Sequence, residues 1–232
     1  MLYFRILTND FKYFPGNPMN NAFSIKDCAL IAIATGKRAQ NLRELQNILS
    51  GIEPDSIYYH FWGNLLKARF ENPECHNDFA AWAGHDLHDK VLAERLCIVD
   101  PTAFDSLEAL RLELIDIVEE RLDELEYPPI AKQDARFEFI RSQIVIFDTH
   151  LEAKTPAEFV EILPLMSIGS IFYHFIDARR RNERHLDDFQ NWMKDLPADY
   201  SEVCQEIAEI DPYFSTLPEL RHRLETVFKN HF

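Results

Sequence analysis

The chain contains nearly the same hexapeptide twice, SIYYHF at residues 56–61 and SIFYHF at residues 170–175. Further stretches of the first half match the second half in the same order: LIAIATG (30–36) with IVIFDTH (144–150), and DFAAW (78–82) with DFQNW (188–192). Two copies do not make a solenoid, which needs about three stacked units or more. The repeat instead predicts a tandem duplication, folded as two similar lobes related by a pseudo-twofold axis.

Each copy of the repeat opens with a continuous apolar run, residues 28–35 in the first copy and 142–149 in the second. Such runs are typical of β-strands that are covered on both faces, and we expect the two strands to pair. Helix-forming residues dominate the rest of the chain, which contains only 6 glycines. The predicted fold is therefore mainly α with a small β element, an α+β protein built from a duplicated strand-plus-helices unit.

The domain boundaries follow from the repeat and from the sequence YPPIAKQD, whose prolines and mixed charges indicate a linker. The predicted parts are an N-terminal extension (1–22), a first repeat lobe (23–126), the linker (127–135) and a second repeat lobe (136–232). Polar residues that precede apolar helical stripes are predicted as N-caps: Asn41, Ser56, Asp78, Thr155, Ser170 and Asp188.

The charge balance limits the partners of the chain, because its formal net charge is −15 at pH 7. A nucleic-acid binder usually presents a basic face to the phosphates, so nucleic acid is excluded as an expected partner. The chain shows neither a signal peptide nor an apolar run of about 18 residues, so no membrane partner is expected. The four cysteines (Cys28, Cys75, Cys97 and Cys204) form no CxxC pair, which fits reduced thiols. We therefore expect a soluble cytoplasmic protein.

The repeated histidines, His60 and His174, each follow a tyrosine, Tyr59 and Tyr173. One interpretation is that these four residues bind a ligand in a cleft between the lobes. The other is structural: each histidine is half-buried and bonded to a helix cap or to an aspartate of its own lobe. The structural interpretation is favoured, because buried polar groups normally find partners.

A second cluster, GHDLHD, contains the histidine–aspartate dipeptide that binds divalent metals in HD-type phosphohydrolases. The candidate ligands are His60, His85, Asp86 and His88. The second copy has Asp195 and Ala198 where His85 and His88 stand, so the cluster is not part of the repeat.

Three consecutive arginines, Arg179, Arg180 and Arg181, form a basic group in an acidic chain. Guanidinium groups suit phosphates and carboxylates, so this group is a candidate site for an anionic ligand. The alternative is internal pairing with Asp177, Glu183, Asp187 or Asp188, which is more usual for clustered charges.

The stretch NDFAAWAGHDLHDKVLAERLCIVDP (77–101) and the segment 140–181 resemble an uncharacterised prokaryotic family, DUF5752. The resemblance extends over nearly the whole chain from about residue 20. Because the family has no established activity, the resemblance implies no catalytic residue and no cofactor.

Taken together, these features predict a non-catalytic regulatory or adaptor module without a cofactor. It would bind a protein partner or a small anionic ligand between two similar helical lobes. These features are also compatible with a homodimer. The alternative prediction is a metal-dependent, HD-like phosphohydrolase that uses the first-lobe cluster.

Overall fold

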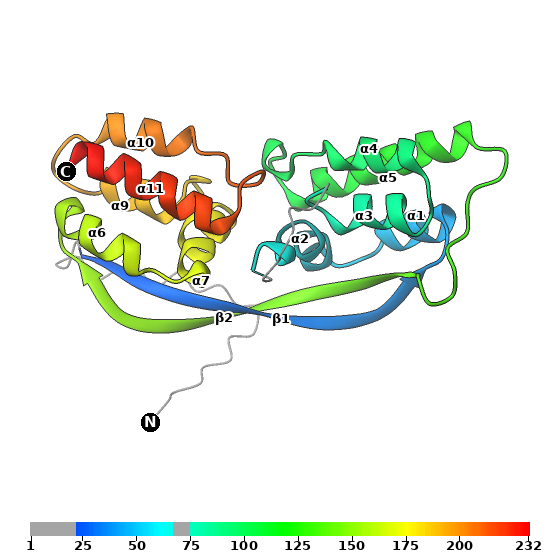
Figure 1. Ribbon diagram of the computed structural model, residues 1–232, viewed down its shortest axis with the longest axis horizontal. Helices are drawn as coiled ribbons and strands as arrows, with labels where there is room; N and C mark the ends of the chain where they lie inside the picture. Colours follow the sequence, from blue (N-terminus) through cyan, green and yellow to red (C-terminus); the bar gives the residue numbers. More distant parts are fainter. Residues whose placement is uncertain (1–21, 67–74) are drawn as a thin grey trace, which may run out of the picture. The chain divides into compact units, whose positions relative to one another are not determined.

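The structure, a computed structural model, describes residues 22–66 and 75–232. Strand β1 (Phe23–Ala39) pairs with strand β2 (Phe137–Ala153) in a two-stranded antiparallel sheet (Figure 1). Both strands are longer than the apolar runs that predict them. Helices make up most of the remaining described chain, so the predicted α+β class and the predicted strand pairing are confirmed.

Among the described residues, five α-helices lie between β1 and β2 in the sequence. They are α1 (Leu42–Leu49), α2 (Pro54–Trp62), α3 (Asp78–His85), α4 (Lys90–Cys97) and α5 (Leu107–Glu124), with 3₁₀ turns at Gly63–Leu66 and Pro101–Ala103. Apolar residues at helical spacing turn one face of each helix inward. In α5 this face includes Leu110, Leu114 and Val118, all of which are buried.

The helices that follow β2 are α6 (Pro156–Ile162), α7 (Ile168–Ile171), α8 (Ala178–Arg181), α9 (Asp188–Lys194), α10 (Ser201–Ala208) and α11 (Leu217–His231). Leu163–Leu165 is a 3₁₀ turn, and Phe172–Asp177 is a π-helical turn between α7 and α8. π-Helical turns are rare and frequently occur at functional sites. Among the helices of the described residues, none combines the length and apolar character that a bilayer crossing requires.

The chain divides into two compact units. The α1–α5 unit contains Leu30–Ile144 and Pro212–Thr216, and the described part of the α6–α11 unit contains residues 22–29, Val145–Asp211 and Leu217–Phe232. The division passes through both strands, so each strand contributes to both units. Neither unit is therefore one continuous segment of the chain.

The first residues of each strand complete the core around the helices of the other repeat. The ring of Phe23 in β1 lies 5.4 Å from that of Phe159 in α6 and 5.2 Å from that of Trp192 in α9, between centroids. The ring of Phe137 in β2 stacks on that of Phe79 in α3 at 4.9 Å. Aromatic rings bury large apolar areas, so these strand residues stabilise a unit to which their own helices do not belong.

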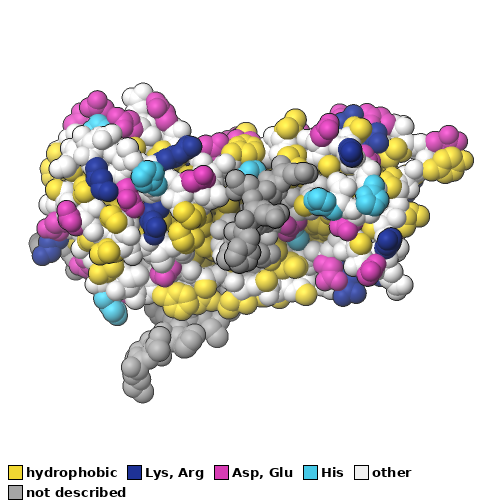
Figure 2. All heavy atoms as spheres, in the orientation of Figure 1, with side chains coloured by type: hydrophobic (Ala, Val, Ile, Leu, Met, Phe, Trp, Pro, Cys, Tyr) yellow, Lys and Arg dark blue, Asp and Glu magenta, His cyan; other side chains and the backbone are white. Residues whose placement is uncertain are grey.

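The middle of the sheet is exposed, contrary to the expectation that both faces are covered. Ile31 in β1 is 50% exposed, and Ile146 and Phe147 in β2 are 43% and 40% exposed. Figure 2 shows hydrophobic side chains reaching the surface along the strands. The apolar run reflects the preference of branched and aromatic residues for strands rather than complete burial.

Of the six predicted helix caps, two are confirmed and four are wrong. Asn41 and Thr155 cap α1 and α6, and each accepts a hydrogen bond from the backbone N–H of a glutamate three residues later. Ser56, however, lies inside α2, and Ser170 lies inside α7, whose cap is Ser167. Both helices begin earlier in the chain than predicted, α2 at Pro54 and α7 after Ser167, so neither serine is at the cap position.

The aspartates at the starts of α3 and α9 are not caps either. Asn77 caps α3 by accepting from Ala80 N–H, and Asp187 caps α9 by accepting from Gln190 N–H. Asp78 and Asp188 are instead the first helical residues. Their carboxylates remain near the positive end of a helix, where negative charge is stabilised, and are available to other side chains.

The prediction that all cysteines are reduced is wrong for two of the four. Cys75 and Cys97 form a disulfide bond with Cα atoms 5.1 Å apart, whereas Cys28 and Cys204 are free and buried. The bond joins the segment before α3 to the end of α4. Sequence spacing without a CxxC pair does not reveal such a contact, because it depends on how the two helices fold back on each other.

Candidate functional site

His60 lies on α2 and is almost fully buried, with 2% of its surface exposed. Its Nδ1 atom lies 2.9 Å from Oδ2 of Asp78, at the start of α3. Its Nε2 atom accepts a hydrogen bond of 3.1 Å from the backbone N–H of Ile140 in β2. Because Nε2 accepts, the ring proton is on Nδ1 and is donated to the carboxylate. The imidazole therefore joins two helices and a strand.

His174, in the π-helical turn, makes the same kind of contact in the α6–α11 unit. Its Nδ1 atom lies 2.7 Å from Oδ2 of Asp188 at the start of α9, and its Nε2 atom accepts a 2.8 Å hydrogen bond from Lys26 N–H in β1. Burial opposes ionisation of Asp188, but the hydrogen bond from His174 and the charge of Arg181 outweigh it and lower the pKa of Asp188. The aspartate is therefore held as a carboxylate that accepts from the imidazole.

Both repeated histidines are thus used structurally. A general base or a metal ligand needs a ring nitrogen that faces the substrate or the metal, and both nitrogens of His60 and His174 already have protein partners. This is the arrangement that the structural interpretation of the sequence predicts. Tyr59 and Tyr173 each lie edge-on to the neighbouring histidine, with ring centroids 5.4 Å and 5.0 Å apart. Ligand binding at these four residues stays a prediction.

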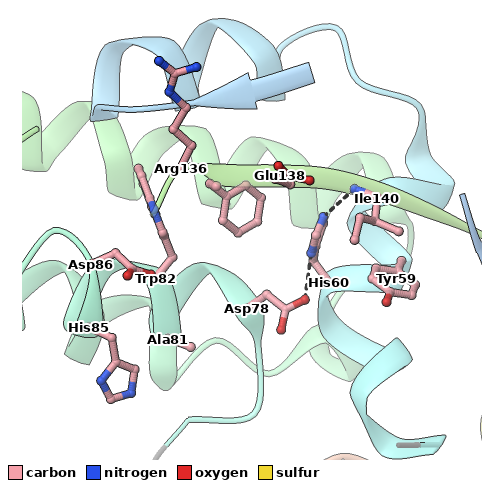
Figure 3. A pocket seen from close by; sticks show the side chains of 11 residues that line it. Tyr59, His60, Asp78, Ala81, Trp82, His85, Asp86, Arg136, Glu138 and Ile140 are labelled. Carbon is pink, nitrogen blue, oxygen red and sulfur yellow. Dashed lines mark hydrogen bonds and ion pairs between the residues drawn. The ribbon is translucent and has the colours of Figure 1, made fainter. Parts of the chain in front are cut away.

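A surface hollow of about 300 Å³ lies beside His60 in the α1–α5 unit (Figure 3). Its lining comes from α2, α3 and the first part of β2: Tyr59, His60, Asp78, Ala81, Trp82, His85, Asp86, Arg136, Phe137, Glu138 and Ile140. The small side chain of Ala81 leaves space on α3, and the buried ring of Trp82 is fixed by a 2.8 Å hydrogen bond from its Nε1 atom to the carbonyl oxygen of Ala135. The hollow therefore has a rigid aromatic wall.

The hollow carries more negative than positive charge. Asp78, Asp86 and Glu138 contribute carboxylates, and Glu138 is paired with Arg38 at 3.1 Å. Arg136 contributes a guanidinium, but Figure 3 shows its side chain extending away from Asp78 and Asp86. Its buried Nε atom has no hydrogen-bond partner within the described residues. The side of the hollow formed by α3 is therefore acidic.

The arginine cluster of α8 is neutralised by carboxylates of its own unit. The ion pairs are Arg180 with Asp177 (3.1 Å), Arg181 with Asp177 (2.8 Å), Arg181 with Asp188 (2.9 Å) and Arg179 with Asp187 (3.7 Å). This is the internal pairing that the sequence offers as the alternative to an anion site. An incoming anion would have to compete with these carboxylates, so the cluster is not preformed for anion binding.

Asp187 is a buried carboxylate whose ion pair with Arg179 is long, at 3.7 Å. Its side chain is fully buried, and burial raises its pKa to about 6. Burial also lowers the pKa of the Arg179 guanidinium. Oδ2 of Asp187 and Nε of Arg179 both lack hydrogen-bond partners within the described residues. This pair is therefore a source of pH-dependent stability.

The four predicted metal ligands form no metal-binding group among the described residues. His60, His85 and Asp86 line the same hollow, but both ring nitrogens of His60 are bonded to Asp78 and Ile140. His88 lies beyond α3, with a positive φ of 55°. Within residues 22–66 and 75–232, no three histidine, cysteine, aspartate or glutamate side chains form a group that could hold a metal ion.

Sequence reasoning missed the residues that give the site its shape. The structural interpretation predicts a helix cap or an aspartate of the same lobe as the histidine partner, but it does not single out Asp78 and Asp188, although both belong to the repeated DFxxW motif. Phe137 and Arg136 precede the apolar run of β2 and belong to the other repeat. The alternation FEF at 137–139 is a signal that the strand begins earlier, but nothing local indicates which helices it meets.

The comparisons with known proteins concern the family and the fold. The sequence model of DUF5752, a family of unknown function, matches residues 20–229. The solved structure of OrfY from Thermoproteus tenax is similar, with a TM-score of 0.77, 24% sequence identity, and coverage of 90% of this chain and 94% of that chain. No curated protein matches the sequence significantly. Since the family model spans nearly the whole sequence, the chain belongs to the DUF5752 family of unknown function.

Proposed function

We propose that this protein is a non-catalytic binding module, with a regulatory or adaptor role, that docks a partner protein at the hollow of the α1–α5 unit. The observation that carries the proposal is the engagement of both ring nitrogens of His60 and His174. The residues best suited to acid–base chemistry hold the fold together, while the hollow beside His60 remains open at the surface. A rigid, partly aromatic hollow is suited to an anchoring side chain of a partner.

A protein partner is favoured over a small anion at this hollow. The carboxylates of Asp78 and Asp86 lie on its α3 side, and the arginines of α8 are paired internally. Like charges facing each other oppose association, so an acidic ligand would bind poorly beside these carboxylates. A partner that presents a basic or an apolar surface fits better.

Gene duplication is part of the same proposal. Its support is the repeated three-part contact, in which a helix histidine joins an aspartate at the start of the next helix to a backbone N–H of a strand. In both cases the strand residue precedes the repeat's apolar run and belongs to the other repeat. The pseudo-twofold relation between the repeats and a cytoplasmic location stay predictions, and of the four cysteines only Cys28 and Cys204 are free thiols.

The experiment compares two variants that place a leucine at corresponding repeat positions. Ala81→Leu fills the hollow, and Asn191→Leu makes the matched change on α9. A partner protein captured with the wild type would be identified, purified and titrated against both variants. We expect Ala81→Leu to abolish binding and Asn191→Leu to retain it, with similar melting temperatures. Equal binding by both variants would refute docking at the hollow.

A further inference from the structure

The α6–α11 unit binds a guanidinium group of its own chain beside the histidine–aspartate pair. The guanidinium of Arg181 lies 3.8 Å from the ring centroid of Tyr173 and donates to Oδ2 of Asp188 at 2.9 Å. It also donates to the carbonyl oxygen of Tyr173 at 2.8 Å and to Asp177 at 2.8 Å. An aromatic face and a carboxylate together recognise a planar cation.

The corresponding residues of the first repeat line the hollow of the α1–α5 unit. The correspondences are Tyr59 with Tyr173, His60 with His174 and Asp78 with Asp188. The position that corresponds to Arg181 is Lys67, which lies outside the described residues. The chain therefore contains a demonstrated guanidinium site in one unit and the related aromatic and carboxylate groups at a surface hollow in the other.

The hollow adds the carboxylate of Asp86 beside the indole of Trp82, and together these groups suit a cation from outside the chain. Asp86 ends α3 at the rim, and its carboxylate makes no ion pair with a described residue; the corresponding residue of the second repeat is Leu196. Trp82 presents its ring within the same lining, held in place by its Nε1 hydrogen bond. Arg136, the one arginine of the lining, points away from Asp86 (Figure 3).

We infer that the hollow accepts the guanidinium group of an arginine side chain presented by the partner protein, packed on the ring of Trp82 and paired with the carboxylate of Asp86. The inference rests on the proposed docking function and names the chemistry of its anchor. Arginine suits this place better than lysine because its planar group stacks on an aromatic ring while pairing with a carboxylate. The net charge of −15 also attracts a basic partner over a longer range.

The test uses three capped tripeptides, acetyl-Gly-Xaa-Gly-amide with arginine, lysine or citrulline in the middle. Citrulline keeps the shape of arginine and removes its charge. Binding to the ¹⁵N-labelled full chain is followed through the indole N–H signal of Trp82. We expect saturable binding of the arginine peptide, weakened about fivefold or more by citrulline and by Asp86→Asn, as for a cation at a partly desolvated aromatic site.

The matched control is Asp195→Asn, which makes the same charge change at the residue that ends α9. It should leave arginine binding within about twofold of the wild type, because Asp195 does not line the hollow and an exposed charge is largely screened by salt. Equal weakening by Asp195→Asn and Asp86→Asn would mean non-specific attraction to an acidic protein and would overturn the inference.

Other outcomes separate this inference from the function on which it rests. If a lysine or citrulline peptide binds as well as arginine, and Ala81→Leu removes this binding while Asp86→Asn does not, the arginine assignment fails and docking at the hollow stands. If no peptide or partner protein binds in a way that Ala81→Leu removes, both fail. Binding of arginine only after Lys67→Ala would assign the hollow to a lysine of the chain itself and overturn the inference.

Discussion

Reduction of the Cys75–Cys97 disulfide should destabilise the α1–α5 unit without rearranging its fold. The two cysteines hold the segment before α3 against the end of α4. The same ends are also joined by a 2.9 Å hydrogen bond from Nδ2 of Asn77 to the carbonyl oxygen of Leu96. Because this contact survives reduction, the folded state keeps its geometry, and the main effect falls on the unfolded chain.

The magnitude follows from the length of the closed loop. The two cysteines are separated by 22 residues in the sequence. In the chain-entropy model, a loop of this size removes about 11 cal/mol/K from the unfolded state, or about 3 kcal/mol at 25 °C. For a unit of this size, a loss of this order is a large part of a typical total stability of roughly 5–15 kcal/mol.

The assay has two steps. Thiol titration of the denatured, unreduced chain should find two free thiols, those of Cys28 and Cys204, among the four cysteines. Urea unfolding of the oxidised and reduced protein, followed by far-UV circular dichroism, should then show the loss of about 3 kcal/mol. The double variant Cys75→Ser/Cys97→Ser should no longer respond to reductant. Four titratable thiols, or identical unfolding curves with and without reductant, would refute the reasoning.

Four further predictions address the packing, the histidine contact, the buried aspartate and metal binding. Gly169→Ala should lower the free energy of unfolding by about 1–3 kcal/mol, because a Cβ atom there would clash with the carbonyl oxygen of Cys28 in β1; an unchanged thermal midpoint would contradict this packing. His174→Gln should lower the midpoint, because one amide cannot reproduce both ring contacts; a stable variant that has lost ligand binding would argue for a functional histidine instead. The folded pKa of Asp187 lies above its ordinary value of 3.8, at about 6, so its contribution to stability is greatest below about pH 4 and falls as the pH rises through 6; Asp187→Asn should remove this slope of roughly 3 kcal/mol, measured by urea unfolding at several pH values, and an equal slope in the variant would contradict it. Zinc or manganese should leave the thermal midpoint unchanged, because the described residues form no metal-ligating group; a rise of several degrees, of the kind that tight binding produces, would show that a site exists.

Local sequence signals were sufficient where short-range physics decides the outcome. The capping boxes that begin at Asn41 and Thr155 mark the starts of α1 and α6, since each box depends on atoms within a few residues. The apolar runs predict both strands for the same reason. The serines at 56 and 170 were misread, because several polar residues near a helix start compete for the cap and local pattern does not rank them.

The candidate site required the tertiary structure. The hydrogen bond between His60 and Ile140 joins residues 80 positions apart, and that between His174 and Lys26 joins residues 148 apart. The repeat in the sequence indicates that the two histidines have similar surroundings, but it favours contacts within one copy. Which strand segment each histidine meets depends on the antiparallel pairing of β1 and β2 along their length.

The sequence by itself thus determined the duplicated pattern, the element types and the family, because these depend on residue identity and on spacing of a few positions. Only the tertiary structure decided three features: the packing of each strand's first residues on the helices of the other repeat, the disulfide between Cys75 and Cys97, and the hollow left by Ala81 beside Trp82. Each of these depends on packing between segments far apart in the chain, where the burial of aromatic rings such as Phe23 and Phe137 selects the partner and no local pattern encodes it.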